Sequence, residues 1–226
     1  MGDLRRLIAF DLDGTLVDSR RDLADSANEL IAELGGRPLT EDAVGRLVGE
    51  GAQLLVARAL RAAGLGHDAA AVLPRFLDIY DLRLLNHTRP YDGMLDLLRM
   101  ARGHARLAVL TNKPKGPSER ILEALGLREF FDDVVGGDGP LPRKPDPAGL
   151  TALMVRAGTA ADATLMIGDS VIDYDAALRA KVRCVMAAYG YGFTMFPPER
   201  LTGDVAIARS TAELGEAIQR FANGSS

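Results

Sequence analysis

Short apolar runs constrain the fold of this chain more than any other feature of its sequence. They lack a regular alternation of apolar and polar residues, and they cover residues 7–10, 107–110, 134–135, 165–167 and 182–187. Continuous apolar runs are typical of strands buried on both faces, as in a parallel sheet. Helical patterns lie between them, for example over residues 118–125 and 148–157. This alternation predicts an α/β fold with a doubly wound parallel sheet.

The segment from about residue 20 to residue 85 breaks the alternation. Its first apolar residues recur at helical spacing and stop before Gly35-Gly36, and similar patterns cover residues 40–48, 52–63 and 69–85. A crossover between parallel strands needs only a dozen or so residues. We therefore predict an inserted α-helical domain over residues 19–85, and a core domain made of residues 1–18 and 86–226.

The composition indicates an ordinary globular protein. Its 27 basic and 31 acidic residues give a net charge of −4, which favours neither a nucleic-acid partner nor a membrane anchor. Cys184 is the only cysteine, so a disulfide within the chain is excluded. No apolar run approaches the ~20 residues of a membrane span, and the first residues lack the apolar core of a signal peptide. We expect a cytoplasmic protein, and its oligomeric state is left open.

Polar clusters follow the predicted strands, at the edge where open α/β sheets bind ligands. The first cluster contains Asp11, Asp13 and Gly14, directly after the strand at residues 7–10. Side chains two residues apart on an extended chain point the same way, so Asp11 and Asp13 are expected to share one pocket. Gly14 allows a tight turn whose amides could bind an anion. Asp and Gly are also common where a strand simply turns, but the buried strand before them favours a site.

Two further clusters are weaker signals. Thr111, Asn112 and Lys113 follow the strand at residues 107–110, a position that suits phosphate oxygens, although Thr and Asn also cap helices. Lys144 stands between Arg143 and Pro145. It could neutralise charge in a pocket as a point cation, or be a solvated surface lysine.

The last cluster contains Asp169, Ser170 and Asp173. If a helix begins at Ser170, Asp173 lies in its first turn, where the helix dipole alone favours an acidic residue. Asp169 would lie near Asp11, and two close carboxylates need a cation to offset their repulsion. Mg²⁺ suits such a site because it takes oxygen ligands from few carboxylates.

Together the four clusters resemble the four motifs of the haloacid dehalogenase-like superfamily of hydrolases, and the resemblance covers essentially the whole chain. The helical insert after the first motif is similar to that family's type-1 cap domain. Within the superfamily the sequence looks most like the phosphoglycolate phosphatases, over residues 89–93, 136–138, 143–147 and 189–192. Two positions depart from the pattern: Ile172 stands where Asn is frequent, and Lys181 stands where Gly is usual.

The resemblance implies a Mg²⁺-dependent phosphatase that hydrolyses a small phosphomonoester, above all 2-phosphoglycolate. It implies that Asp11 is the nucleophile, forming an aspartyl-phosphate, and that Asp13 is the general acid and base. Asp11, the main-chain carbonyl of Asp13, and Asp169 would bind Mg²⁺. The resemblance also implies that the phosphate is bound by Gly14, Thr111, Asn112 and Lys144. Ser170 and Asp173 would orient the groups that bind the phosphate and the metal.

In the helical insert we expect Arg46, Glu50 and Gly51 to contact the substrate, with Arg46 as the cation for an acidic substrate. The glycines there equally fit turn geometry.

The alternatives to this function are a β-phosphoglucomutase-like mutase, a phosphatase for a nucleotide, a sugar phosphate or pyrophosphate, and a non-enzymatic binding protein on the same scaffold. An acid/base residue at Asp13 implies phosphoryl transfer, because the family's dehalogenases and phosphonatases lack one there.

Overall fold

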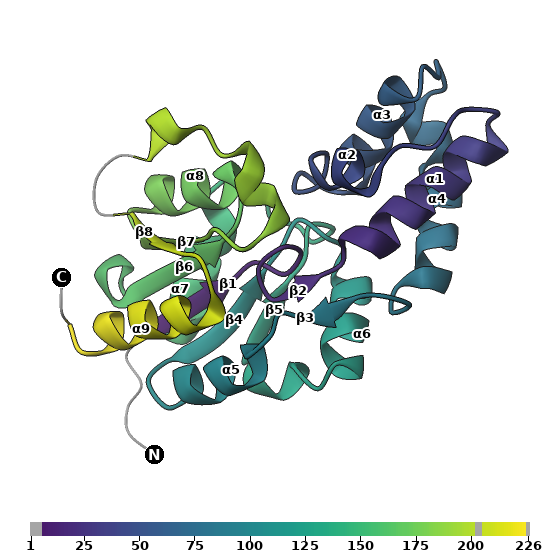
Figure 1. Cartoon of the computed structure of the whole chain (residues 1–226). Coiled ribbons are helices and arrows are strands. Elements are labelled where there is room, and N and C mark those ends of the chain that lie inside the picture. Colours follow the sequence, from purple (N-terminus) through teal and green to yellow (C-terminus); the bar gives the residue numbers. More distant parts are fainter. Residues whose placement is uncertain (1–5, 202–204, 225–226) are drawn as a thin grey trace.

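A six-stranded sheet forms the centre of the computed structural model, which describes residues 6–201 and 205–224 (Figure 1). All paired strands are parallel, in the order β5-β4-β1-β6-β7-β8. The strands are β1 (Leu7–Phe10), β4 (Arg106–Leu110), β5 (Asp133–Val135), β6 (Thr164–Gly168), β7 (Arg183–Ala187) and β8 (Ala206–Ala208). The chain builds outward from β1 to one edge and then from β6 to the other, so the strand order reverses at β1.

Helices cover both faces of this sheet. Ile8 and Phe10 of β1 belong to one apolar core with residues of α5, α6 and α9, whereas Leu7 and Ala9 belong to a second core with residues of α7 and α8. These helices are α5 (Met94–Arg102), α6 (Lys115–Ala124), α7 (Ala148–Ala157), α8 (Val171–Ala180) and α9 (Thr211–Ala222). Burial on both faces explains the missing alternation in the strands, and the predicted doubly wound α/β fold is confirmed.

Four helices lie between the two strands of a short antiparallel ribbon, β2 (Val17–Asp18) and β3 (Arg89–Pro90). They are α1 (Arg20–Glu33), α2 (Glu41–Gly45), α3 (Ala52–Ala62) and α4 (Ala69–Arg83), and they project beyond the sheet as a separate lobe (Figure 1). We call this group the helical lobe. The division into domains at residues 18–19 and 85–86 stays a prediction, and part of the predicted core domain, residues 1–5, 202–204 and 225–226, lies outside the described residues.

Short 3₁₀ helices connect several of these elements, at Arg128–Phe130, Ala161–Ala163, Tyr191–Met195 and Pro198–Arg200. Among the described residues, no helix is both long enough and apolar enough to cross a membrane.

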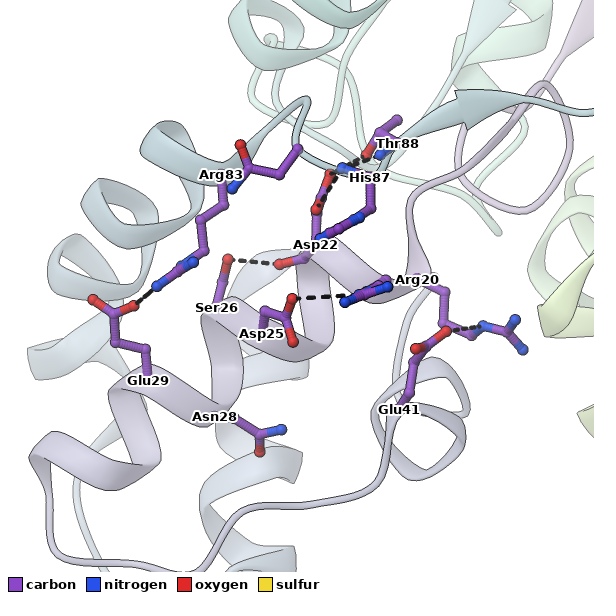
Figure 2. A network of polar contacts seen from close by, with 12 residues as sticks. Arg20, Asp22, Asp25, Ser26, Asn28, Glu29, Glu41, Arg83, His87 and Thr88 are labelled. Carbon is purple, nitrogen blue, oxygen red and sulfur yellow. Dashed lines mark hydrogen bonds and ion pairs between the residues drawn. The ribbon is translucent and has the colours of Figure 1, made fainter.

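A buried carboxylate fastens the helical lobe to the chain that returns to the sheet. Asp22, in the first turn of α1, is 1% exposed. Its oxygens accept hydrogen bonds from the main-chain nitrogens of His87 and Thr88, and from the Thr88 hydroxyl, at 2.8–3.0 Å. Figure 2 shows this junction, together with the pair between Glu29 of α1 and Arg83 of α4. Because Thr88 directly precedes β3, Asp22 sets where the chain leaves the lobe.

Candidate active site

The carboxyl ends of the central strands bring together polar groups from distant parts of the chain. Asp11 directly follows β1, Thr111 follows β4, and β6 ends just before Asp169. Lys144 comes from the loop before α7, and all four side chains are buried. The expected convergence of four segments on one sheet edge is therefore present.

Lys144 lies at the centre of this group. Its Nζ is 2.8 Å from Asp11 Oδ1 and 2.6 Å from Asp173 Oδ1, and its side chain is 1% exposed, so it is not a solvated surface lysine. Burial alone would lower the pKa of Lys144, but the carboxylates of Asp11 and Asp173 raise it above its ordinary value. The ammonium therefore stays charged and faces the predicted nucleophile.

Asp173 serves two purposes at the start of α8. Its Oδ2 accepts hydrogen bonds from the backbone nitrogen and the hydroxyl of Ser170, which forms a capping box at the N-terminus of this helix. Its Oδ1 accepts the hydrogen bond from Lys144. The helix cap therefore fixes the carboxylate that contacts the lysine, and the orienting roles expected of Ser170 and Asp173 stay predictions.

Three buried carboxylates face this one lysine. Asp11, Asp169 and Asp173 each offer an oxygen within 4.8 Å of the others. Burial raises the pKa of Asp11 to about 6 despite the nearby Lys144 ammonium. Burial, with the negative charges of Asp173 and Asp11, raises the pKa of Asp169 well above its ordinary value. The site therefore carries more negative charge than its lysine offsets, and it is suited to bind a cation.

Glycines allow the chain to pack directly on Asp169. A Cβ atom on Gly190 would lie 2.1 Å from the carbonyl oxygen of Gly14 and 2.4 Å from Cβ of Asp169. Gly192 donates its N–H to Asp169 Oδ2 over 2.8 Å. Gly14 has φ +86° and uses its own N–H to bond Val17 O, so its amide closes the turn. Phosphate binding by Gly14 stays a prediction. The hydrogen bond that the Gly14 amide already makes to Val17 argues against it.

The oxygen-rich donor set fits a hard divalent cation. Oδ1 of Asp11 accepts no hydrogen bond, although the Lys144 ammonium is an ion-pair partner. Buried carboxylate oxygens with spare lone pairs are what Mg²⁺ and Ca²⁺ bind. The structure adds Asp173 to the acidic group expected from the sequence. The main-chain carbonyl of Asp13 as a ligand stays a prediction.

Asp13 has different partners from Asp11, although both line one cavity as expected. Its Oδ1 and Oδ2 are each 3.0 Å from Nζ of Lys113, and Oδ1 also accepts a hydrogen bond of 2.5 Å from the Ser19 hydroxyl. The carboxylate of Asp13 is thus held by Lys113, which also contacts Tyr80 of the helical lobe.

The cavity lies between the strand ends and the helical lobe and holds about 50 Å³ of water-sized space. Asp11, Asp13, Thr111, Asn112 and Lys113 line its polar end. The helical lobe contributes mainly apolar walls: Leu23, Val48, Gly49, Gly51, Ala52, Leu55, Phe76, Leu77 and Tyr80. The tyrosine hydroxyl of Tyr80 is the one polar side-chain group among these lobe residues.

Asn112 and Thr111 bind the surrounding main chain. The amide of Asn112 donates to the carbonyls of Lys144 and Gly49 over 2.9 and 3.0 Å, and its oxygen accepts from Lys144 N over 2.9 Å. Asn112 therefore positions the loop that carries Lys144. Thr111 accepts from the amide of Lys113 and keeps its own O–H as a donor in the cavity. Direct phosphate contacts by either residue stay predictions.

Of the residues predicted to contact substrate from the lobe, Gly51 lines the cavity. Arg46 and Glu50 line a neighbouring recess beside Ile172, and Glu50 pairs with Arg58. The cavity therefore does not include Arg46 among its lining residues, and the roles of all three stay predictions.

Lys113 belongs to a cluster that the sequence singles out, but no role in the site was predicted for it. Its side chain is 6% exposed, and its Nζ is 2.6 Å from the Tyr80 hydroxyl and 4.6 Å from the centre of that ring. Burial alone would lower the pKa of Lys113, but Asp13 and Tyr80 raise it. A signal existed, because Lys113 is one of only four lysines and directly follows Thr111-Asn112. Tyr80 lies in a helix without any such signal.

Fold and site together define a doubly wound α/β protein with a buried carboxylate beside a lysine, and a buried acidic group suited to a cation, at its strand ends. The family model described as haloacid dehalogenase-like hydrolase matches residues 8–187. The chain belongs to this family of hydrolases.

Several relatives share most of its length. The chain is 46% identical over 219 residues to a phosphoglycolate phosphatase of Rhodospirillum rubrum, covering 93% of this chain and 90% of the relative. It is 42% identical over 197 residues to a phosphoglycolate phosphatase of Pseudomonas putida, covering 84% and 72%. Its fold matches the crystal structure of a predicted phosphoglycolate phosphatase from Haemophilus somnus with a TM-score of 0.86 and 32% identity, covering 96% and 99% of the two chains.

Proposed function

We propose that this protein is a Mg²⁺-dependent phosphatase that hydrolyses 2-phosphoglycolate through a phosphorylated Asp11. The observation that carries the proposal is the position of Asp11: its carboxylate lines the cavity and contacts the buried ammonium of Lys144. Two relatives that cover most of the chain bear the name phosphoglycolate phosphatase, which supports the substrate.

In the first step, a carboxylate oxygen of Asp11 attacks phosphorus, and the bond from phosphorus to the alcohol oxygen breaks. Lys144 and the Thr111 hydroxyl stabilise the charge on the phosphoryl oxygens. Asp13 donates a proton to the leaving oxygen, giving glycolate. Asp11 and Asp169 would hold Mg²⁺ with the main-chain carbonyl of Asp13, and the bound ion supplies positive charge beside the phosphoryl group.

In the second step, Asp13 takes a proton from water. That water attacks phosphorus, the bond to Asp11 breaks, and phosphate leaves. Asp13 is then protonated again, and Asp11 is a free carboxylate. The contact between Lys144 and Asp173 keeps the ammonium in place through both steps.

The lining of the cavity supports a small acid over a sugar. A sugar phosphate brings several hydroxyls, and buried hydroxyls need hydrogen-bond partners. The lobe residues that line the cavity offer one side-chain hydroxyl, that of Tyr80, among apolar side chains. A glycolate group needs a cation for its carboxylate and little else, because the rest of it is one methylene. This argues against the mutase, nucleotide and sugar-phosphate alternatives.

Mg²⁺-dependent phosphate release from a panel of small phosphomonoesters tests the proposal. The panel contains 2-phosphoglycolate, glucose 1-phosphate, glucose 6-phosphate, a nucleoside monophosphate and pyrophosphate. We expect 2-phosphoglycolate to have the highest kcat/KM. Asp11→Asn is expected to lower its kcat by about 10⁴-fold or more.

Asp96→Asn is the matched control, because Asp96 is an 85% exposed carboxylate in α5 that does not line the cavity. It should retain wild-type turnover. Full activity in Asp11→Asn would end the mechanism. A clear preference for another ester would remove the substrate and keep the mechanism, and isomerised glucose phosphate would favour the mutase.

A further inference from the structure

Lys113 is a buried charge in the cavity that the proposed reaction does not use. We propose that Lys113, together with Tyr80, binds the carboxylate of the substrate and exchanges its ion pair with Asp13 for that contact. This inference rests on the proposed function, because it names the group that distinguishes 2-phosphoglycolate from other phosphomonoesters.

The position of Lys113 suits this role. It lies in the loop after β4, two residues beyond Thr111. It lines the same cavity as Asp11 and Asp13. The two lysines of the site have different partners. Lys144 contacts Asp11, whereas Lys113 contacts Asp13 and, in the helical lobe, Tyr80. A substrate whose phosphate is at Asp11 therefore extends its remaining atoms toward Lys113 and Tyr80.

Tyr80 completes a two-donor site. Lys113 donates to the Tyr80 oxygen, so the hydroxyl proton of Tyr80 is available to a second acceptor. The ammonium has further protons that now bond to both oxygens of Asp13. A substrate carboxylate has two oxygens, and it can accept one hydrogen bond from each residue. Tyr80 belongs to α4 of the helical lobe and Lys113 to the loop after β4, so the two adjacent donors come from different parts of the chain.

Binding of the substrate carboxylate by Lys113 can be distinguished from a purely structural role, in which Lys113 only holds Asp13. A buried ammonium needs an anionic partner, and Asp13 supplies one in the structure. If Lys113 serves only to hold Asp13, its removal harms every substrate equally. If it binds the substrate carboxylate, its removal harms carboxylated substrates selectively. When the carboxylate takes over Lys113, Asp13 keeps its bond to Ser19 and regains an oxygen that can face the substrate.

Steady-state kinetics on two substrates test the proposal. Lys113→Met is compared with wild type on 2-phosphoglycolate and on ethyl phosphate, which has a methyl group in place of the carboxylate. We expect kcat/KM for 2-phosphoglycolate to fall about 100-fold more than that for ethyl phosphate, because only the first substrate has the carboxylate that Lys113 would bind. Tyr80→Phe should shift the ratio in the same direction by about tenfold. Lys115→Met, at a 53% exposed lysine two residues on, is the control and should change neither.

Removing Lys113 also leaves Asp13 without its cation. A second comparison avoids that effect by using protein in which Asp13 is replaced by Asn. Calorimetry measures binding to Asp11→Asn/Asp13→Asn protein with and without Lys113→Met. We expect Kd for 2-phosphoglycolate to rise about 100-fold and Kd for ethyl phosphate to stay the same. Equal losses for both ligands, in kinetics or binding, would overturn the proposal. Wild-type protein that ignores 2-phosphoglycolate but hydrolyses other esters would instead overturn the proposed function.

Discussion

Asp11 and Asp13 are two residues apart, yet their carboxylates contact different groups. Asp11 is 6% exposed and contacts Lys144, which favours an ionised carboxylate beside a phosphoryl group. Asp13 contacts Lys113 and the Ser19 hydroxyl at the side of the helical lobe. The two carboxylates therefore have different partners, and each has a lysine of its own.

The residue at 181 shows how a single departure from a family pattern affects stability. Lys181 ends α8 with φ +58°, in the left-handed region where a Cβ atom is strained. We predict that Lys181→Gly stabilises the protein by about 1 kcal/mol, measured by urea unfolding. Gly158 ends α7 with φ +65°, so Gly158→Lys should destabilise by a similar amount. Equal midpoints for Lys181→Gly and wild type would contradict this.

Most of the residues that meet at the candidate site could be predicted from residue type and position. Asp11, Thr111 and Asp169 follow apolar strands directly, so the topology of a parallel sheet brings them together. Tyr80 could not be predicted, because it lies in α4 and reaches the cavity only through the packing of the lobe on the sheet. The burial of Lys113 could not be predicted either, and the cation expected for an acidic substrate was Arg46, which does not line the cavity.

At the level of elements, several strands and helices were predicted with accurate bounds, but some of the shortest strands were not. The strand at Leu7–Phe10 and the helix at Ala148–Ala157 have the predicted bounds. The helix expected over residues 40–48 is only α2, Glu41–Gly45, since the chain turns at Gly49 with φ +126°. The strands β2, β3 and β8 have two or three residues each and contain too little pattern to detect.

The junction at Asp22 is an element-scale feature that only the structure reveals (Figure 2). Its carboxylate accepts from two main-chain nitrogens and one hydroxyl, and an asparagine would place an NH₂ group against those donors. We predict that Asp22→Asn lowers the free energy of unfolding by about 2 kcal/mol, measured in urea.

Asp25→Asn is the control for this change. Asp25 lies one turn along α1, is 46% exposed, and pairs only loosely with Arg21 at 3.9 Å. Its loss should cost less than about 0.5 kcal/mol. Matching unfolding curves for Asp22→Asn and Asp25→Asn would show that the buried junction does not hold the lobe in place.

For the whole molecule, the site depends on how the helical lobe meets the sheet. Asn112 donates to Gly49 O, Lys113 donates to Tyr80, and both contacts span the two parts. A substrate that reaches Asp11 must pass between these surfaces, so opening and closing of the lobe is part of the reaction cycle we expect.

The excess of buried carboxylates predicts how the metal-free protein responds to pH. The folded-state pKa of Asp11 is about 6 against an ordinary 3.8, and that of Asp169 is also raised. The folded state then binds more protons than the unfolded chain, so the stability of metal-free protein falls as pH rises from about 4 to 7. Thermal unfolding in EDTA checks this sign.

Mg²⁺ should reverse that loss. At pH 8 and 100-fold above its Kd, it is expected to stabilise the protein by about 2.7 kcal/mol, and by less at pH 5 where protons compete. Asp169→Asn should abolish the gain. An equal effect of Mg²⁺ on wild type and Asp169→Asn would place the ion elsewhere.

The central claim is that Asp11 receives the phosphoryl group of 2-phosphoglycolate. The most direct test is an acid quench during the first turnover, followed by mass analysis of the peptide that contains Asp11. We predict one phosphoryl group on Asp11 in wild type and none in Asp11→Asn. Release of phosphate in that first turnover without phosphorylation of Asp11, or with the group on another residue, would contradict the account.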